Sequence, residues 1–413
     1  MSRISKALQS LKSEGVKSWT FTTLREFANR NNPFRQGPLA FVYAEDAIAA
    51  DWTKKTDFND FAFGKSIQSF NVAWIISPPG RTSGGHQNAF RFMKVLEDAG
   101  HTLTVYLYSP AKYPVVNIEA VKQLLHETTA YPDLKAEIKV YSPETGIAGE
   151  FDALFASDWG TAYAAYRYPG KAKRLYFTQD YEPWFFSRGS DYVLAENTYR
   201  FGFFGISAEK WLAQKLSHEF GMPGGAYEYG VDSSKYHLTN SNRRTEVLFY
   251  ARPPTPRRAT EFGLLALQEL HLQRPDITIN LVGWDMSDFE VPFPYVNNSA
   301  LDIKDLNAVY NRCAAGLALS LTNLSLLPME LMGAGVVPVV NDAENTRAIL
   351  ESKYIEFVPM SPKAIAQKLI EQVDRKNQTK YAKTISDSVA KSEWSDPAQQ
   401  FIELFNTCMK KKC

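Results

Sequence analysis

The stretch NVAWIISPPGRTSGGHQNAFRFMKVLEDAGHTLTVYLY, residues 71–108, decides the fold. Its first seven residues form an apolar run that is typical of a strand buried on both faces. A loop with two prolines leads to Gly84-Gly85, and apolar residues then recur at helical spacing as far as Gly100, a residue type that commonly ends helices. The closing run HTLTVYLY predicts a second strand. We therefore expect one strand–loop–helix–strand unit with a Gly-Gly turn at the start of its helix.

Strand and helix signals continue to alternate along the rest of the chain. Strands are predicted at Ala153–Ser157, Arg174–Thr178, Phe201–Ile206, Gly225–Tyr229, Glu246–Tyr250, Ile277–Val282, Gly316–Leu321 and Val336–Val340. Helices are predicted at Ile118–His126, from a cap at Ser207 to about His218, and at Ala259–Leu272, Ile303–Arg312 and Pro328–Gly333. This alternation indicates an α/β protein whose parallel sheets carry helices on both faces.

A polar segment, GVDSSKYHLTNSNRRT at 230–245, divides the alternation into two series. We expect two doubly wound, Rossmann-like domains, at 1–232 and 233–392, with an irregular or helical stretch over 1–70. Ligands bind such sheets at the carboxyl ends of their strands, so two facing sheets would hold a ligand in the cleft between them. A last helix, within 393–413 and with Asp396 as its N-cap, carries an apolar stripe and is expected to cross back to the first domain.

Charge and composition exclude several classes of protein. Among 413 residues, 46 Lys and Arg balance 45 Asp and Glu, a net charge of +1, whereas a dedicated nucleic-acid binder is usually strongly basic. The three cysteines, Cys313, Cys408 and Cys413, lack the paired spacing of a disulfide framework or zinc knuckle. No secretory h-region and no membrane-length apolar run occurs, which predicts a cytoplasmic protein.

The N-terminal segment leaves two interpretations open. Ile4, Leu8 and Leu11 share one helical face with lysines nearby. Such a helix either seeks a membrane surface or packs on its own domain. The basic tail Lys410-Lys411-Lys412 is a second feature that would support weak peripheral membrane contact.

Three arginines follow the predicted strand at 246–250. Arg252 comes directly after this strand, and Arg257 and Arg258 begin the next helix. Three guanidinium groups at one strand end would repel each other without an anion between them. A diphosphate fits, since arginine offers forked donors and a permanent charge. The alternative is a salt-bridged or solvated surface cluster.

Two further segments could contact the same ligand. The Gly84-Gly85 turn lets backbone N–H groups approach an anion, although it could also be only a tight turn. The common NAD and ATP motifs are not complete here. G-x-G-x-x-G is absent, and Gly64-Lys65-Ser66 has Asn59 where a P-loop needs glycine.

The segment SLTNLSLLPMELMGAGVVP, residues 320–338, is the most informative. Its backbone N–H groups at Ser325, Leu326 and Leu327 precede a helix and could hold phosphate, while Glu330 on that helix could accept a hydrogen bond from a ribose hydroxyl. The alternative is an ordinary helix start with a solvated glutamate.

Together these motifs resemble those of a known family. They are the Gly-Gly loop, GHTLTV at 100–105, GVD at 230–232, the three arginines and Glu330. From about residue 71 onward the chain is similar to glycosyltransferases of the GT-B fold, in the large retaining group called family 4. The resemblance implies a first domain that binds an acceptor and a second that binds a nucleotide sugar. It places the arginines on the donor diphosphate and Glu330, the second glutamate of the family's E-x7-E motif, on the ribose.

The departures from the family pattern concern the sugar. Thr322 stands where the family has its first glutamate, and no histidine stands near Ser157, where the family has one. The variants ARPPTPRR at 251–258 and QDYE at 179–182 resemble a subgroup of rhamnosyltransferases in bacterial polysaccharide and S-layer glycan assembly. The resemblance therefore implies dTDP-L-rhamnose as donor and a growing, lipid-linked glycan as acceptor.

The resemblance also implies a mechanism. The family implies front-face attack, in which Arg252 and Arg258 stabilise the leaving diphosphate and a phosphate oxygen takes the acceptor proton. Asp158 is the acidic candidate for catalysis, and Gln179, Asp180 and Glu182 are candidates for acceptor binding. No D-x-D triplet occurs, and with arginines available we expect no metal or other cofactor. The alternatives are an epimerase or inverting transferase on the same fold, or a glycan-binding protein without activity.

Overall fold

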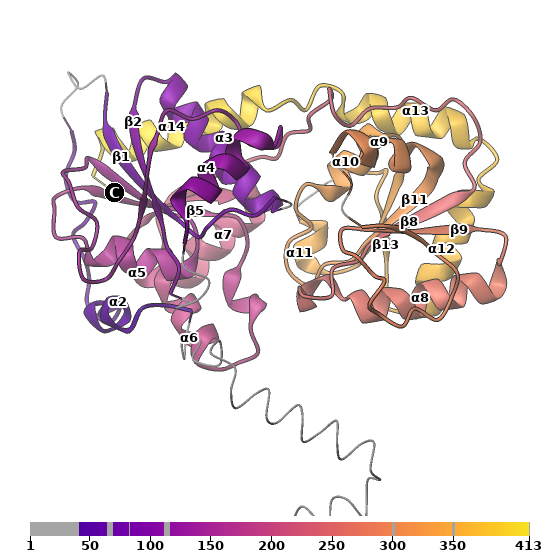
Figure 1. Ribbon diagram of the computed structural model, residues 1–413, viewed down its shortest axis with the longest axis horizontal. Coiled ribbons are helices and arrows are strands. Elements are labelled where there is room, and N and C mark those ends of the chain that lie inside the picture. Colours follow the sequence, from indigo (N-terminus) through magenta and orange to yellow (C-terminus); the bar gives the residue numbers. More distant parts are fainter. Residues whose placement is uncertain are drawn as a thin grey trace, which may run out of the picture.

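The computed structural model describes residues 41–63, 69–81, 83–110, 116–299, 301, 303–348 and 352–412. The predicted helix around Ile4, Leu8 and Leu11 and the tripeptide Gly64-Lys65-Ser66 lie outside these residues. The described chain forms two α/β units that stand side by side, each built on one sheet with helices on both faces (Figure 1).

The first unit holds a seven-stranded, fully parallel sheet in the order β3-β2-β1-β4-β5-β6-β7. Its strands are β1 Asn71–Ile76, β2 Thr102–Leu107, β3 Glu137–Val140, β4 Ala153–Ala156, β5 Lys173–Thr178, β6 Phe204–Ala208 and β7 Gly224–Tyr227. Its α-helices are α2 Ala44–Ala49, α3 Gly84–Asp98, α4 Ile118–Glu127, α5 Trp159–Arg167, α6 Ser190–Asn197 and α7 Glu209–Phe220, with short 3₁₀ turns η2 Glu182–Phe185 and η3 Thr198–Arg200.

The second unit holds a six-stranded parallel sheet in the order β10-β9-β8-β11-β12-β13. Its strands are β8 Glu246–Tyr250, β9 Thr278–Val282, β10 Val296–Asn298, β11 Cys313–Ala318, β12 Val337–Asn341 and β13 Glu356–Val358. Its helices are η4 Pro256–Arg258, α8 Thr260–Gln273, α9 Ile303–Arg312, α10 Leu327–Gly333, α11 Glu344–Arg347, α12 Pro362–Asp374 and α13 Gln378–Val389. The strand order of both sheets reverses beside the first strand, which opens a crevice at the carboxyl ends.

The C-terminal helix α14, Ser395–Lys410, belongs to the core of the first unit, as predicted (Figure 1). Phe401 and Phe405 are fully buried against Trp74 of β1 and Phe155 of β4. Trp74 stacks on Phe155 with 4.4 Å between ring centroids, and Phe401 lies 5.8 Å from Phe155. The apolar run of β1 is thus buried on both faces, since α5 and its neighbours cover the opposite side.

Several boundaries differ from the sequence-based expectations. Ser207 lies inside β6 and does not cap α7, whose N-cap is Ala208. Asp396 lies in the first turn of α14, and the N-cap is Trp394. The strand expected at Gly316–Leu321 begins three residues earlier, at Cys313, because the small residues that follow Arg312 are buried and pair with β8.

A polar cleft between the two sheets

The carboxyl ends of the strands from both units face one cleft. The cleft contains a cavity of about 310 Å³, lined by loops after β1, β4 and β5 of the first unit and after β8 and β11 of the second. A second cavity of about 230 Å³ lies mainly on the second unit. Both cavities are lined by Gly84, Tyr250, Arg258 and Ser325, so the two spaces meet at these residues.

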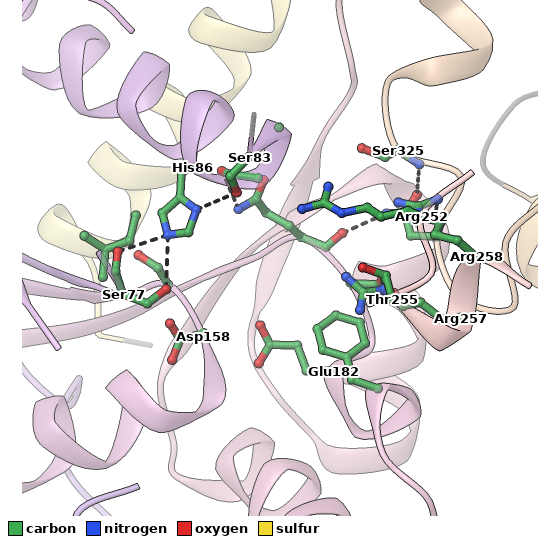
Figure 2. Close-up of a pocket in the computed structure, with 18 of the residues that line it drawn as sticks. Ser77, Ser83, His86, Asp158, Glu182, Arg252, Thr255, Arg257, Arg258 and Ser325 are labelled. Carbon is green, nitrogen blue, oxygen red and sulfur yellow. Dashed lines mark hydrogen bonds and ion pairs between the residues drawn. The ribbon is translucent and has the colours of Figure 1, made fainter. Parts of the chain in front are cut away.

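The three predicted arginines all line the first cavity, and Arg258 lines the second as well (Figure 2). Arg258 donates to the carbonyl of Asn323 at 3.0 Å, and Arg252 donates to the hydroxyl of Tyr250 at 3.2 Å. The Arg257 guanidinium lies 3.8 Å over the ring centre of Phe185, on the opposite unit. These contacts fix the directions of the side chains and leave donors over for a ligand.

The Arg257 side chain is 27% exposed, whereas its Nε is buried. Its Nε makes no hydrogen bond and lies 4.0 Å from the carboxylate of Asp180. Burial lowers the pKa of Arg257, and the positive charges of Arg258 and Arg252 lower it further. The negative charge of Asp180 raises the pKa, but only in part. A buried guanidinium that lacks a full set of partners is the arrangement that an anionic ligand would complete.

Two residues with strained backbone conformations lie beside the arginines and the cavities. Ala259 and Ser325 have φ angles of 47° and 58°, a region that side chains other than glycine rarely adopt. Ala259 follows the arginines, and Ser325 lines both cavities. Such strain is maintained only where the surrounding structure imposes it, and it is frequent at ligand sites. The Ser325 N–H, expected to hold phosphate, already donates to Asn323 Oδ1 at 2.7 Å.

The other residues expected to hold phosphate also line these cavities. Gly84 and Gly85 are the first residues of α3 and line the first cavity. Leu326 and Leu327 line the second cavity beside α10.

Polar contacts join the two units beside the cavities. Thr322, which replaces the family's first glutamate, donates its hydroxyl to Asp180 Oδ2 at 2.7 Å. The Asn323 amide donates to the Gln179 carbonyl at 2.7 Å. The Gln179 side chain in turn donates to the carbonyl of Gly85 at 3.0 Å. Gln179 and Asp180, expected to bind an acceptor, therefore also connect the two units.

Glu182 and Asp158 line the first cavity and also support the first unit. Glu182 Oε2 accepts the backbone N–H of Trp159 at 2.6 Å and the hydroxyl of Tyr176 at 3.1 Å. Asp158 caps α5 by accepting the N–H of Thr161 at 2.9 Å. Burial raises the pKa of both carboxyl groups.

Glu330 lies in the second cavity with an apolar wall. The cavity is lined there by Val282, Leu301, Leu306 and Tyr310. Burial raises the pKa of Glu330 to about 7, against the opposing effects of Arg91 and of a hydrogen bond from Tyr236. An apolar wall beside a carboxylate suits a nucleoside, whose base is apolar on both faces and whose sugar carries hydroxyl donors.

Sequence reasoning missed several cavity residues, most notably His86, Ser77 and Ser83. The ring of His86 bridges the two serines, with Nδ1 2.6 Å from Ser83 Oγ and Nε2 3.0 Å from the Ser77 carbonyl. A usable signal was present, because His86 directly follows Gly84-Gly85 and Ser77 ends the first strand run.

Two negative findings apply to the described part of the chain. Within the ranges given above, no three His, Cys, Asp or Glu side chains are grouped as a metal site would need. Among the helices of those same residues, none is both long enough and apolar enough to cross a membrane.

The fold and the cleft define a protein of the GT-B class, with two Rossmann-like units facing an arginine-lined cleft. Staphylococcus aureus TarM, in complex with UDP, fondaparinux and α-GlcNAc-glycerol, superposes with a TM-score of 0.63 over 82% of this chain and 100% of TarM, at 8% identity. A Listeria monocytogenes protein described as a UDP-N-acetylglucosamine 2-epimerase superposes with a TM-score of 0.55 over 81% of this chain and 95% of its own, at 13% identity.

Sequence comparison adds a more specific likeness. Residues 245–370 match the family model for the C-terminal domain of WsaF. The O-antigen biosynthesis protein RfbC of Myxococcus xanthus is 30% identical over 288 residues, which are 68% of this chain. The chain spans 22% of the length of RfbC.

Proposed function

We propose that the protein is a glycosyltransferase that takes a sugar from a nucleoside diphosphate and adds it to a growing bacterial surface glycan. One observation carries the proposal: three arginines, one with an unpaired buried Nε, line the first cavity, and Arg258 among them also lines the second. One cavity has the size and lining for a nucleoside, and the other opens between the two units. The likeness to RfbC, which is described as an O-antigen biosynthesis protein, supports surface glycan assembly as the setting.

The chemistry follows from this arrangement. The acceptor oxygen forms a bond to the anomeric carbon as the bond from that carbon to the diphosphate breaks. Negative charge grows on the leaving diphosphate, and Arg252, Arg257 and Arg258 stabilise it. In the retaining mechanism that we propose, attack occurs on the face of the leaving group, and a phosphate oxygen takes the acceptor proton. The arginines supply positive charge that transferases of another fold obtain from a metal ion, so we propose that none is needed.

We propose dTDP-L-rhamnose as the donor. The sequence resemblance to rhamnosyltransferases supports it. The surroundings of Thr322 are compatible with a deoxysugar, because its hydroxyl is already bonded to Asp180 and its small side chain offers no carboxylate to a sugar hydroxyl. Glu330 would accept a hydrogen bond from the 3′-hydroxyl of the nucleoside.

The acceptor belongs to the same proposal. The first unit supplies Asp158, Gln179, Asp180 and Glu182 around the first cavity, and these groups can accept hydrogen bonds from a glycan. We propose a lipid-linked glycan and a location in the cytoplasm at the inner face of the membrane, with no role for nucleic acid.

A thermal-shift titration with dTDP, UDP and GDP, with and without EDTA, tests the donor. A ligand at 100 times its dissociation constant adds about 2.7 kcal/mol to the free energy of unfolding. We expect the largest shift with dTDP, unchanged by EDTA. A larger shift with UDP or GDP would contradict dTDP-L-rhamnose as the donor, and the proposal that the protein is a glycosyltransferase would stand.

Transfer itself is tested with dTDP-L-rhamnose and a glycan acceptor. We expect Arg252→Ala to lower the rate at least a hundredfold. The matched control is Arg274→Ala, which breaks an exposed ion pair with Asp276 and Asp374 and should leave transfer unchanged. Release of free sugar nucleotide products without an acceptor would identify an epimerase instead. If the wild type shows no transfer and Arg252→Ala binds glycan as well as the wild type does, the protein is a glycan-binding protein.

A further inference from the structure

A chain of hydrogen bonds runs from the cleft into the first unit (Figure 2). Ser83 Oγ lies 2.6 Å from His86 Nδ1. On the far side of the ring, His86 Nε2 lies 3.0 Å from the carbonyl of Ser77 and 3.1 Å from its hydroxyl. Ser77 also lowers the pKa of Asp158, against the larger effect of burial. All four residues line the first cavity, opposite the arginines.

The direction of each bond in this chain can be derived. A carbonyl oxygen only accepts, so His86 Nε2 must carry the proton that it shares with Ser77. Burial lowers the pKa of His86 to about 4, so the ring is neutral at ordinary pH. Its Nδ1 then has no proton and must accept from Ser83. The only hydroxyl proton of Ser83 is therefore used inside the protein.

The Ser83 side chain does not cap α3, although its position at the start of this helix suggests that it would. It is the N-cap residue of α3, where a serine oxygen usually accepts a backbone N–H of the first turn. The structure contains no such side-chain bond at Ser83. The hydroxyl instead hydrogen-bonds His86. Ser83 lines the first cavity, and its oxygen still has free lone pairs.

We propose that Ser83 is an acceptor-only contact for a sugar hydroxyl in the cleft, and that His86 is the positioning residue that keeps it so. The proposal deepens the proposed function and rests on it. A group that can only accept forces the sugar hydroxyl to donate toward Ser83, which fixes the direction of that hydroxyl's lone pairs. The hydroxyl is not the one that attacks, because the proton of the attacking hydroxyl goes to a phosphate oxygen. The shared chemistry is a hydroxyl donor, from either the acceptor or the donor sugar.

Kinetics of a double-mutant cycle test the proposal. Ser83→Ala should lower kcat/KM for transfer about tenfold, the value of one hydrogen bond, while Ser83→Thr should recover most of it. His86→Phe should cost a similar factor, and the double variant should be no worse than the poorer single variant, because both act through one hydroxyl. Ser361→Ala, at the N-cap of α12 in the second unit, is the matched control. Full activity in Ser83→Ala, or multiplied losses in the double variant, would overturn the proposal.

Hydrolysis of the donor in the absence of acceptor identifies the sugar involved. A loss in Ser83→Ala that appears in transfer and not in hydrolysis assigns the hydroxyl to the acceptor. An equal loss in both reactions assigns it to the donor sugar. The dTDP-induced thermal shift should be the same in Ser83→Ala and wild type, since the diphosphate lies with the arginines.

A measurement independent of activity separates this proposal from the proposed function. Two-bond ¹H–¹⁵N spectra of the whole protein labelled in histidine report which ring nitrogen carries the proton, and His86→Gln assigns the signal. We expect the Nε2–H form at pH 7 and a change of the Nδ1 resonance in Ser83→Ala. A charged ring or an Nδ1–H form would overturn the proposal even if transfer is observed. Absence of transfer in wild type, with the expected spectra, would instead contradict the proposed function.

Discussion

Buried arginines in this protein fall into two kinds, which only the structure separates. Arg244 is 2% exposed and donates to the carbonyls of Cys313, Ala334 and Gly335, so its donors satisfy the ends of neighbouring elements. The side chain of Arg257 is 27% exposed, and its buried Nε has no hydrogen bond. Sequence reasoning grouped the arginines of the cleft correctly by their position after a strand. It had no means of recognising which arginine lacks partners.

This contrast gives a prediction for two substitutions. Arg244→Ala should lower the free energy of unfolding by about 3 kcal/mol or more, because several buried carbonyls lose their donors, and it should leave dTDP affinity unchanged. Arg257→Ala should instead weaken dTDP binding and change the free energy of unfolding by no more than about 1 kcal/mol. Urea unfolding and isothermal titration calorimetry measure the two quantities. Equal effects of both variants on dTDP affinity would contradict the assignment.

Glu330 gives a prediction for pH. Its folded-state pKa of about 7 lies above the ordinary value of 4.5, so the folded protein favours the protonated form. Stability from this group is full below about pH 4.5 and is lost as pH rises toward 7. Glu330→Gln should therefore be more stable than wild type at pH 8, and the advantage should shrink toward pH 5. Denaturant unfolding at both pH values checks this.

Glu209 provides the control for this experiment. Burial also raises its pKa to about 7, and Glu209 itself lines neither cavity; it accepts the N–H of Tyr229, which lines the first. Glu209→Gln should remove a similar part of the pH dependence. Only Glu330→Gln should also change dTDP affinity, and a change in both variants would argue against a nucleoside site at Glu330.

At the scale of elements, α14 supplies the clearest test. Phe401 is fully buried between α3 and the first sheet. Phe401→Ala should lower the free energy of unfolding by about 3–5 kcal/mol, through lost burial and the cavity left behind. Phe289→Ala, at a side chain that is 42% exposed, should change it much less. Chemical denaturation measures both. Similar values for the two variants would mean that α14 is only loosely docked.

The sequence predicted elements best where the pattern is strong. The apolar run of β1 and the stripe of α14 were both recognised, and both are buried as expected. The strand at Glu137–Val140 was not predicted, because this edge strand is only half-buried and lacks an apolar run. The helix α6 also went unnamed, since its apolar residues do not form a stripe. Weakly buried elements leave weak patterns.

At the scale of the whole molecule, the two units are joined by contacts that no local pattern reveals. Thr322 and Asp180 are 142 residues apart and share a 2.7 Å hydrogen bond. The sequence predicted a cleft and part of its lining, including the three arginines and Glu330. It could not predict which of these residues bond across the cleft, because that depends on how two separately folded sheets face each other.

Thr322→Val is therefore expected to loosen the closed arrangement. The substitution keeps the size of the side chain and removes the hydroxyl donor, which leaves the buried Asp180 with one bond fewer. Small-angle X-ray scattering should show a larger radius of gyration for the variant, and dTDP-L-rhamnose should reduce it. Thr384→Val, at an exposed position of α13, is the control. Identical scattering curves for variant and wild type would mean that other contacts hold the units together.

The position of α14 also has a consequence for how the protein is made. A ribosome releases the seven strands of the first unit long before it releases Phe401 and Phe405, which lie on the far side of the whole second unit in the sequence. Until then the faces of Trp74 and Phe155 that α14 covers have no partner. The second unit, whose sheet and helices are contiguous in the chain, can complete its core first. The first unit is thus synthesised first, but it completes its core after the second unit does.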